Sequence, residues 1–78
     1  MIRKLKILPQ YFNDVLSGYK SFELRKDDRD YKVGDKLQLM EWDKEFTDRS
    51  CIRDVIYILR DVEKYGLKKG FVILGIRV

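Results

Sequence analysis

Residues 18–26 read Gly-Tyr-Lys-Ser-Phe-Glu-Leu-Arg-Lys and place charged side chains at intervals around a short strand-like pattern. Phe22 and Leu24 alternate with polar neighbours, so the segment predicts a strand with one distinctly polar face. Lys20 comes just before this strand, and on a regular strand it would share a face with Phe22. Contact between Lys20 and Glu23 therefore requires that the lysine lies in a loop or at a bulge.

A second charged segment begins with Val33-Gly34-Asp35, which reads as a turn into another strand. That strand is predicted over residues 36–42, because Leu37 and Leu39 alternate with polar residues. If both strands belong to one sheet, their charged side chains form a polar cleft on a small β-fold.

Glu41 continues the alternation of the apolar residues in this second strand, so the pattern points its carboxylate toward the interior. An unpaired carboxylate would be costly there, and Arg25 or Lys20 is the natural partner. In the alternative, the strand ends by Met40 and Glu41 is solvated. Trp42 also has two interpretations. Its ring either packs in the core or forms a partly exposed stacking surface.

The remaining segments predict three further strands and one helix, so the chain is expected to form a single α+β domain over residues 1–78. Five strands with one helix after the first indicate a small β-barrel, closed or partly closed, which removes most exposed sheet edges. Gly75 is a candidate bend or bulge. The elements are a strand over 4–7 with Leu5 and Ile7 inward, a helix from Pro9 to Gly18 with Phe12, Val15 and Leu16 on one face, the charged strand over 21–25, and strands over 53–59 and 71–78.

Length and composition are typical of one small folded domain. The 78 residues are 45% hydrophobic and 38% charged, which indicates a modest core under a heavily solvated exterior. No apolar run approaches the roughly 20 residues that span a bilayer. The sequence therefore predicts no membrane association and, by default, a cytoplasmic location.

The residue types that are absent exclude several kinds of site. There is no histidine, and Cys51 is the single cysteine, so the usual zinc ligands and Ser-His or Cys-His pairs cannot form. We expect no metal and no cofactor. Any catalysis would depend on lysine, carboxylate or tyrosine groups.

The charge balance permits an anionic partner without requiring one. The formal net charge is +4, from 17 basic and 13 acidic residues. Between Lys20 and Lys36 the two signs are nearly matched, so only the fold can separate them into patches. The alternative for residues 26–32 is a solvated loop whose charges pair with one another.

Two motifs resemble a known family. Gly18 to Arg25 fits the pattern GxKxxExR, and Val33 to Leu39 fits VGDxLxL; together they resemble the signature of ASCH domains in the PUA-like superfamily. The chain is most similar to a short bacterial and phage family, domain of unknown function family 3850. That likeness extends through the segment Leu5 to Trp42 and through Gly66 to Leu74, which fits the ending GLxxG[YF]VIL.

The resemblance implies a PUA-like barrel with a cleft that binds RNA or a nucleotide-like ligand. Basic side chains there would contact phosphates, and aromatic rings, with Tyr19 and Phe46 as further candidates, would stack on unpaired bases. The expected site residues are Lys20, Glu23, Arg25, Lys26, Arg29, Tyr31, Glu41 and Trp42.

Two other classes of function stay open. Some short ASCH proteins are amidohydrolases that act on acylated cytidine through a lysine, a threonine and a glutamate. Lys20 matches the lysine, but Glu23 stands in place of the threonine and only Glu63 approximates the glutamate; a pair of Lys20 and Glu41 is the other catalytic combination. The third class is a protein-interaction module, such as a homodimer formed through the outer face of the last strand.

Overall fold

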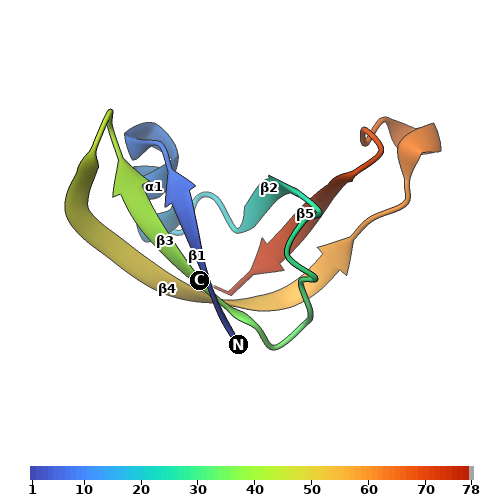
Figure 1. Ribbon diagram of the computed structural model, residues 1–78, viewed down its shortest axis with the longest axis horizontal. Coiled ribbons are helices and arrows are strands. Elements are labelled where there is room, and N and C mark those ends of the chain that lie inside the picture. Colours follow the sequence, from blue (N-terminus) through green and yellow to red (C-terminus); the bar gives the residue numbers. More distant parts are fainter. Residues whose placement is uncertain (78) are drawn as a thin grey trace.

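The computed structural model describes residues 1–77 and contains five strands, one α-helix and one short 3-10 helix in that range (Figure 1). The α+β prediction is therefore confirmed. None of these helices is long and apolar enough to cross a membrane. In chain order the elements are β1 (Ile2–Ile7), α1 (Pro9–Leu16), β2 (Phe22–Lys26), β3 (Lys36–Trp42), β4 (Phe46–Leu59), η1 (Glu63–Tyr65) and β5 (Phe71–Ile76).

The strands form one mixed sheet in the order β1-β3-β4-β5-β2. β1 runs parallel to β3, and all other neighbours are antiparallel. β4 has 14 residues and curves along the whole molecule, so that its first half pairs with β3 and its second half with β5 (Figure 1). The sheet therefore has two arms, one carrying β1, β3 and α1 and the other carrying β2 and β5.

β1 and β2 lie at the two edges of the sheet and are not paired with each other in the described residues. The sequence predicted a closed or partly closed barrel, and the described strands do not close into a barrel by pairing β1 with β2. Arginine side chains bridge the gap instead: Arg25 Nη2 donates to the carbonyl of Lys6 at 2.5 Å, and Arg29 Nη1 donates to that of Lys4 at 3.1 Å. We call this gap between β1 and β2 the seam. Guanidinium groups there satisfy edge carbonyls that a neighbouring strand would otherwise bind.

The core is built by α1, by the loop residue Tyr31 and by β1, β3, β4 and β5. Leu5 and Ile7 are each 5% exposed, as their alternation predicted. On α1, Phe12 and Val15 are buried, whereas Leu16 is 46% exposed and the prediction that it shares their buried face is wrong. The other buried apolar residues are Tyr31, Leu37, Leu39, Val55, Val72, Leu74 and Ile76.

The predicted strand boundaries differ from the observed ones mainly at β4. The strand over 36–42 is confirmed without change. β4 begins at Phe46, whereas the sequence predicted a start at residue 53. The prediction missed residues 46–52 because they are mostly exposed and carry no alternation that marks a half-buried strand. Their pairing with β3 through the backbone defines the strand. β5 ends at Ile76, and the predicted extension to Val78 reaches outside the described residues.

Gly75 lies opposite a register shift in β4, which confirms that it marks an irregularity in the sheet. A Cβ atom at Gly75 would lie 3.1 Å from Tyr57 Cβ, closer than van der Waals contact. β4 and β5 each have a second neighbouring strand, so they cannot separate freely. We expect Gly75→Val to lower the free energy of unfolding by about 1–3 kcal/mol, measured by urea denaturation. Ile73→Val, on the same strand, is the control, and a Gly75→Val protein as stable as this control would contradict the prediction.

Candidate ligand-binding site

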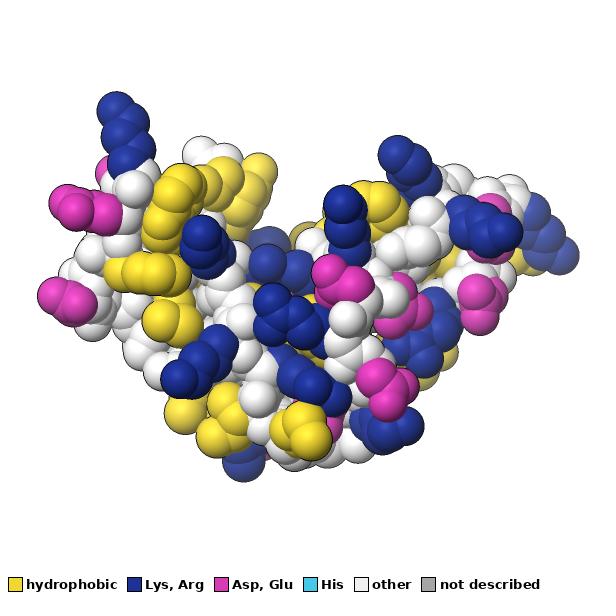
Figure 2. All heavy atoms as spheres, in the orientation of Figure 1, with side chains coloured by type: hydrophobic (Ala, Val, Ile, Leu, Met, Phe, Trp, Pro, Cys, Tyr) yellow, Lys and Arg dark blue, Asp and Glu magenta, His cyan; other side chains and the backbone are white. Residues whose placement is uncertain are grey.

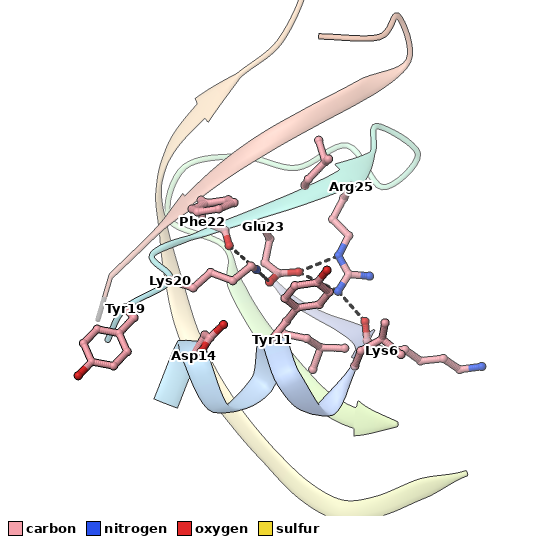
Figure 3. A pocket seen from close by; sticks show the side chains of 11 residues that line it. Lys6, Tyr11, Asp14, Tyr19, Lys20, Phe22, Glu23 and Arg25 are labelled. Atoms are coloured by element: carbon pink, nitrogen blue, oxygen red, sulfur yellow. Dashed lines mark hydrogen bonds and ion pairs between the residues drawn. The ribbon is translucent and has the colours of Figure 1, made fainter. Parts of the chain in front are cut away.

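A cleft of about 630 Å³ opens between α1 and the free edge of β2 (Figure 3). Its walls come from the end of β1, from one side of α1, from the loop after α1 and from β2. The lining residues are Lys6, Ile7, Leu8, Tyr11, Asp14, Tyr19, Lys20, Phe22, Glu23, Leu24 and Arg25. The cleft combines mostly apolar walls with a few charged groups, which is the usual character of a small-ligand site.

A buried carboxylate holds two cations inside the cleft (Figure 3). Glu23 is 3% exposed, and its Oε1 forms an ion pair with Lys20 Nζ. Its Oε2 accepts hydrogen bonds from Arg25 Nε at 3.0 Å and from Arg25 Nη2 at 2.9 Å. Lys20 Nζ also donates to the carbonyl of Phe22 at 2.7 Å. Lys20, Glu23 and Arg25, the charge cluster, are therefore fixed relative to one another with a net charge of +1.

The end of α1 explains how Lys20 reaches Glu23. Gly18 has a φ of 80°, a left-handed conformation that turns the chain after the helix. The amides of Tyr19 and Lys20 then both donate to the carbonyl of Asp14, at 3.0 and 3.1 Å. Lys20 therefore lies in the loop before β2, as contact with Glu23 requires, and this part of the prediction is confirmed.

β2 has the predicted alternation, but its polar face is the buried one. Glu23 is buried, whereas Phe22 and Leu24 are 47% and 55% exposed. Burial of the carboxylate is tolerated because both of its oxygens accept hydrogen bonds from cationic side chains. The apolar side chains of β2 are consequently left at the cleft and on the adjoining outer face.

Aromatic rings flank the charge cluster. Lys20 Nζ lies 5.0 Å from the centre of the Phe22 ring and 5.7 Å from that of Tyr11. Tyr19 is 87% exposed, and its ring points away from the cluster (Figure 3). Sequence reasoning missed Tyr11, Asp14 and Phe22 as site residues. The spacing of Tyr11 and Asp14 was an available signal, because residues i and i+3 share one side of a helix.

Three predicted site residues line a different hollow. Lys26, Arg29 and Tyr31 adjoin a space of about 220 Å³ beside the cleft, and Arg25 lines both spaces. Tyr31 is only 2% exposed, and burial raises the pKa of its phenol. Its prediction as a stacking surface is wrong, because its ring is part of the core.

Glu41 is buried, as strand parity predicted, but its predicted partners are wrong. Thr47 Oγ1 donates to Glu41 Oε1 at 2.6 Å, and Arg49 Nε lies 3.4 Å from the same oxygen. Both partners belong to β4, which pairs with β3 around Glu41. The early start of β4 was not predicted, so these partners were missed. Glu41 does not line the cleft that contains Lys20.

Trp42 is half-buried and also lies outside the cleft lining. Lys6 Nζ is 4.9 Å from the centre of the Trp42 ring and 5.7 Å from that of Phe46. Lys6 also lines the cleft, so Lys6 is the residue that connects the Trp42 and Phe46 rings to the cleft. Among the predicted site residues, the structure thus brings together Lys20, Glu23 and Arg25.

Comparison with known proteins gives the chain a family. A family model described as "Domain of unknown function (DUF3850)" matches residues 2–76. A protein of Escherichia phage P2, described as "Uncharacterized 12.9 kDa protein in GpA 3'region", is 49% identical over 41 residues. The aligned region covers 53% of this chain and 38% of the phage protein, so the likeness spans well under half of that relative. Because the family model covers nearly the whole length, this chain belongs to the DUF3850 family.

Proposed function

We propose that this chain is a small RNA-binding domain of the ASCH type in the PUA-like superfamily, and that the cleft between α1 and β2 receives an unpaired nucleotide. The charge cluster is the observation that carries the proposal. Support also comes from the GxKxxExR pattern, because its lysine, glutamate and arginine are the members of the cluster.

The cluster has the properties of an anion site. Glu23 fixes both cations, yet Arg25 Nη1 has no hydrogen-bond partner among residues 1–77, and an ammonium group has three donors of which Lys20 uses two. The Lys20 and Arg25 side chains are 15% and 22% exposed, so both remain accessible from the cleft. A phosphate oxygen or a base carbonyl would complete the donors that remain.

The walls of the cleft suit a base. Tyr11 and Phe22 are 43% and 47% exposed, and both rings lie close to Lys20 Nζ. Stacking of a base on such a ring contributes about 1–3 kcal/mol. Figure 2 shows further Lys and Arg side chains around the hollow between the two arms, where they would attract the phosphate backbone.

Hydrolysis of an acylated nucleoside, the alternative function, agrees less well with the geometry. A general base must offer a lone pair to its substrate, whereas Lys20 Nζ forms an ion pair with Glu23, and the ammonium group of such a pair has no lone pair. Neither Glu41 nor Glu63 lines the cleft. Ligand positioning is therefore the better-supported role of the cluster.

We expect Lys20→Gln to weaken the binding of short single-stranded RNA at least about tenfold, because a charge-assisted contact is lost. The measurement is amide NMR shift mapping of the labelled protein, titrated with mixed-sequence RNA octamers and separately with cytidine and acetylcytidine. In the unmodified protein, salt-sensitive shifts should concentrate at the charge cluster and at Tyr11 and Phe22.

Lys32→Gln is the matched control, because it removes the same charge from an exposed lysine that does not line the cleft. Its affinity should remain close to that of the unmodified protein. Equal affinities of the Lys20 and Lys32 variants, or shifts spread evenly over the surface, would contradict the proposal. Turnover of acetylcytidine that is lost in Lys20→Gln would instead favour the hydrolase.

A further inference from the structure

We infer that the binding groove continues beyond the cleft into a second subsite, so that the ligand is a strand of two or more nucleotides rather than a single nucleotide. This inference rests on the proposed function. The second subsite is the hollow of about 300 Å³ lined by Leu24, Gly66, Leu67, Lys68 and Phe71. Leu24 lines both the cleft and this hollow and is 55% exposed, so the two spaces share a wall.

The register of β2 and β5 accounts for this continuity. Leu24 pairs with Ile73, and Lys26 pairs with Phe71. Leu24 and Phe71 are therefore diagonal neighbours on one face of the sheet, opposite to the face that buries Glu23. A ligand that leaves the charge cluster across the edge of β2 meets Leu24 first and Phe71 next.

The free edge of β2 adds backbone groups between the two subsites. The Ser21 carbonyl accepts from the Ile76 amide, and the Asp27 amide donates to the Gly70 carbonyl. By the alternation of an antiparallel ladder, the N–H and C=O of Leu24 point away from β5 and toward the free edge. One donor and one acceptor at a single residue match the hydrogen-bonding edge of a base.

The chemistry of the hollow favours nucleic acid as its occupant. Its floor is apolar, and Lys68 Nζ lies 5.8 Å from the centre of the Phe71 ring. The segment from η1 to Phe71 contains three lysines, Lys64, Lys68 and Lys69, against one acidic residue, Glu63. An apolar surface with Lys68 at its wall, in a lysine-rich segment, complements a stacked base and its phosphate.

Two glycines determine the shape of the loop that forms the hollow. Gly66 and Gly70 have φ values of 108° and 85°, which suit glycine and turn the chain at each end of the loop. Between them, Leu67 is half-buried and Lys68 is exposed, so neither is fixed by core packing. The motif Gly-Leu-Lys-Lys-Gly-Phe thus builds a surface rather than a part of the core.

The test compares RNA length in matched variants of the full chain. The probes are the nucleoside monophosphate and the tetranucleotide of whichever base binds most tightly, with dissociation constants measured at one fixed salt concentration. We expect the tetranucleotide to bind at least about tenfold more tightly than the monophosphate. Lys68→Gln and Leu67→Ala should each remove most of this gain and leave the monophosphate affinity unchanged, whereas Lys32→Gln should change neither.

The outcomes separate this inference from the proposed function. If Lys20→Gln weakens both probes but neither Lys68→Gln nor Leu67→Ala affects the length gain, the second subsite is refuted and the cleft proposal stands. If Lys20→Gln changes neither probe, the proposed function fails and the subsite fails with it. A molecular mass that rises with concentration and returns to that of one chain in Leu24→Glu would assign the groove to a second copy and overturn the inference.

Discussion

Replacing Glu23 with glutamine is expected to lower the free energy of unfolding by about 3 kcal/mol. The carboxylate is 3% exposed and is the shared partner of Lys20 and Arg25, whose side chains are themselves mostly buried. Removing one charge from a buried ionic group leaves the remaining charges uncompensated, which typically costs 3–5 kcal/mol. We use the lower value because both cations retain some access to water. For a domain of this size, the midpoint of thermal unfolding should fall by about 12–24 °C.

Asp54→Asn is the matched control for Glu23→Gln. Asp54 also pairs with a lysine, at 2.6 Å from Lys36 Nζ, but both side chains are substantially exposed. Exposed pairs contribute little, so the control should lose much less stability than Glu23→Gln in the same urea titrations. A loss in Glu23→Gln no larger than that of the control would show that the buried carboxylate does not stabilise this fold.

The charge cluster also shows what the sequence could and could not predict about the site. Lys20, Glu23 and Arg25 lie within one short segment, and the sequence predicted contact between Lys20 and Glu23 only on the condition that Lys20 lies in a loop or at a bulge. The sequence could not show which face of β2 is buried, since Phe22 and Leu24 are the natural core residues of such a pattern. That choice depends on the pairing of β2 with β5, which places Glu23 opposite Leu74, a residue of the buried core.

Predictions that depended on contacts between distant segments were less successful. Glu41 was correctly predicted to face inward, yet its partners Thr47 and Arg49 come from a part of β4 without an apolar pattern. Tyr31 was predicted to contact the ligand, but its side chain is buried. Nothing in the sequence around a loop tyrosine indicates whether its ring is buried or exposed. Local periodicity determines strands and their faces, whereas pairing across the sheet decides which side chains meet.

Arg25→Met is expected to lower the free energy of unfolding by about 2–3 kcal/mol and to loosen β1 before the rest of the sheet. The substitution removes the Arg25 contacts of Glu23 and the bridge across the seam to the Lys6 carbonyl. Hydrogen exchange should therefore accelerate in β1 and β2 more than in β4 and β5, because both edge strands lose their link. Arg29→Met removes a single seam hydrogen bond and should cost about 1 kcal/mol. Uniform acceleration across the sheet in Arg25→Met, or equal losses in the two variants, would contradict the view that Arg25 is the stronger of the two bridges across the seam.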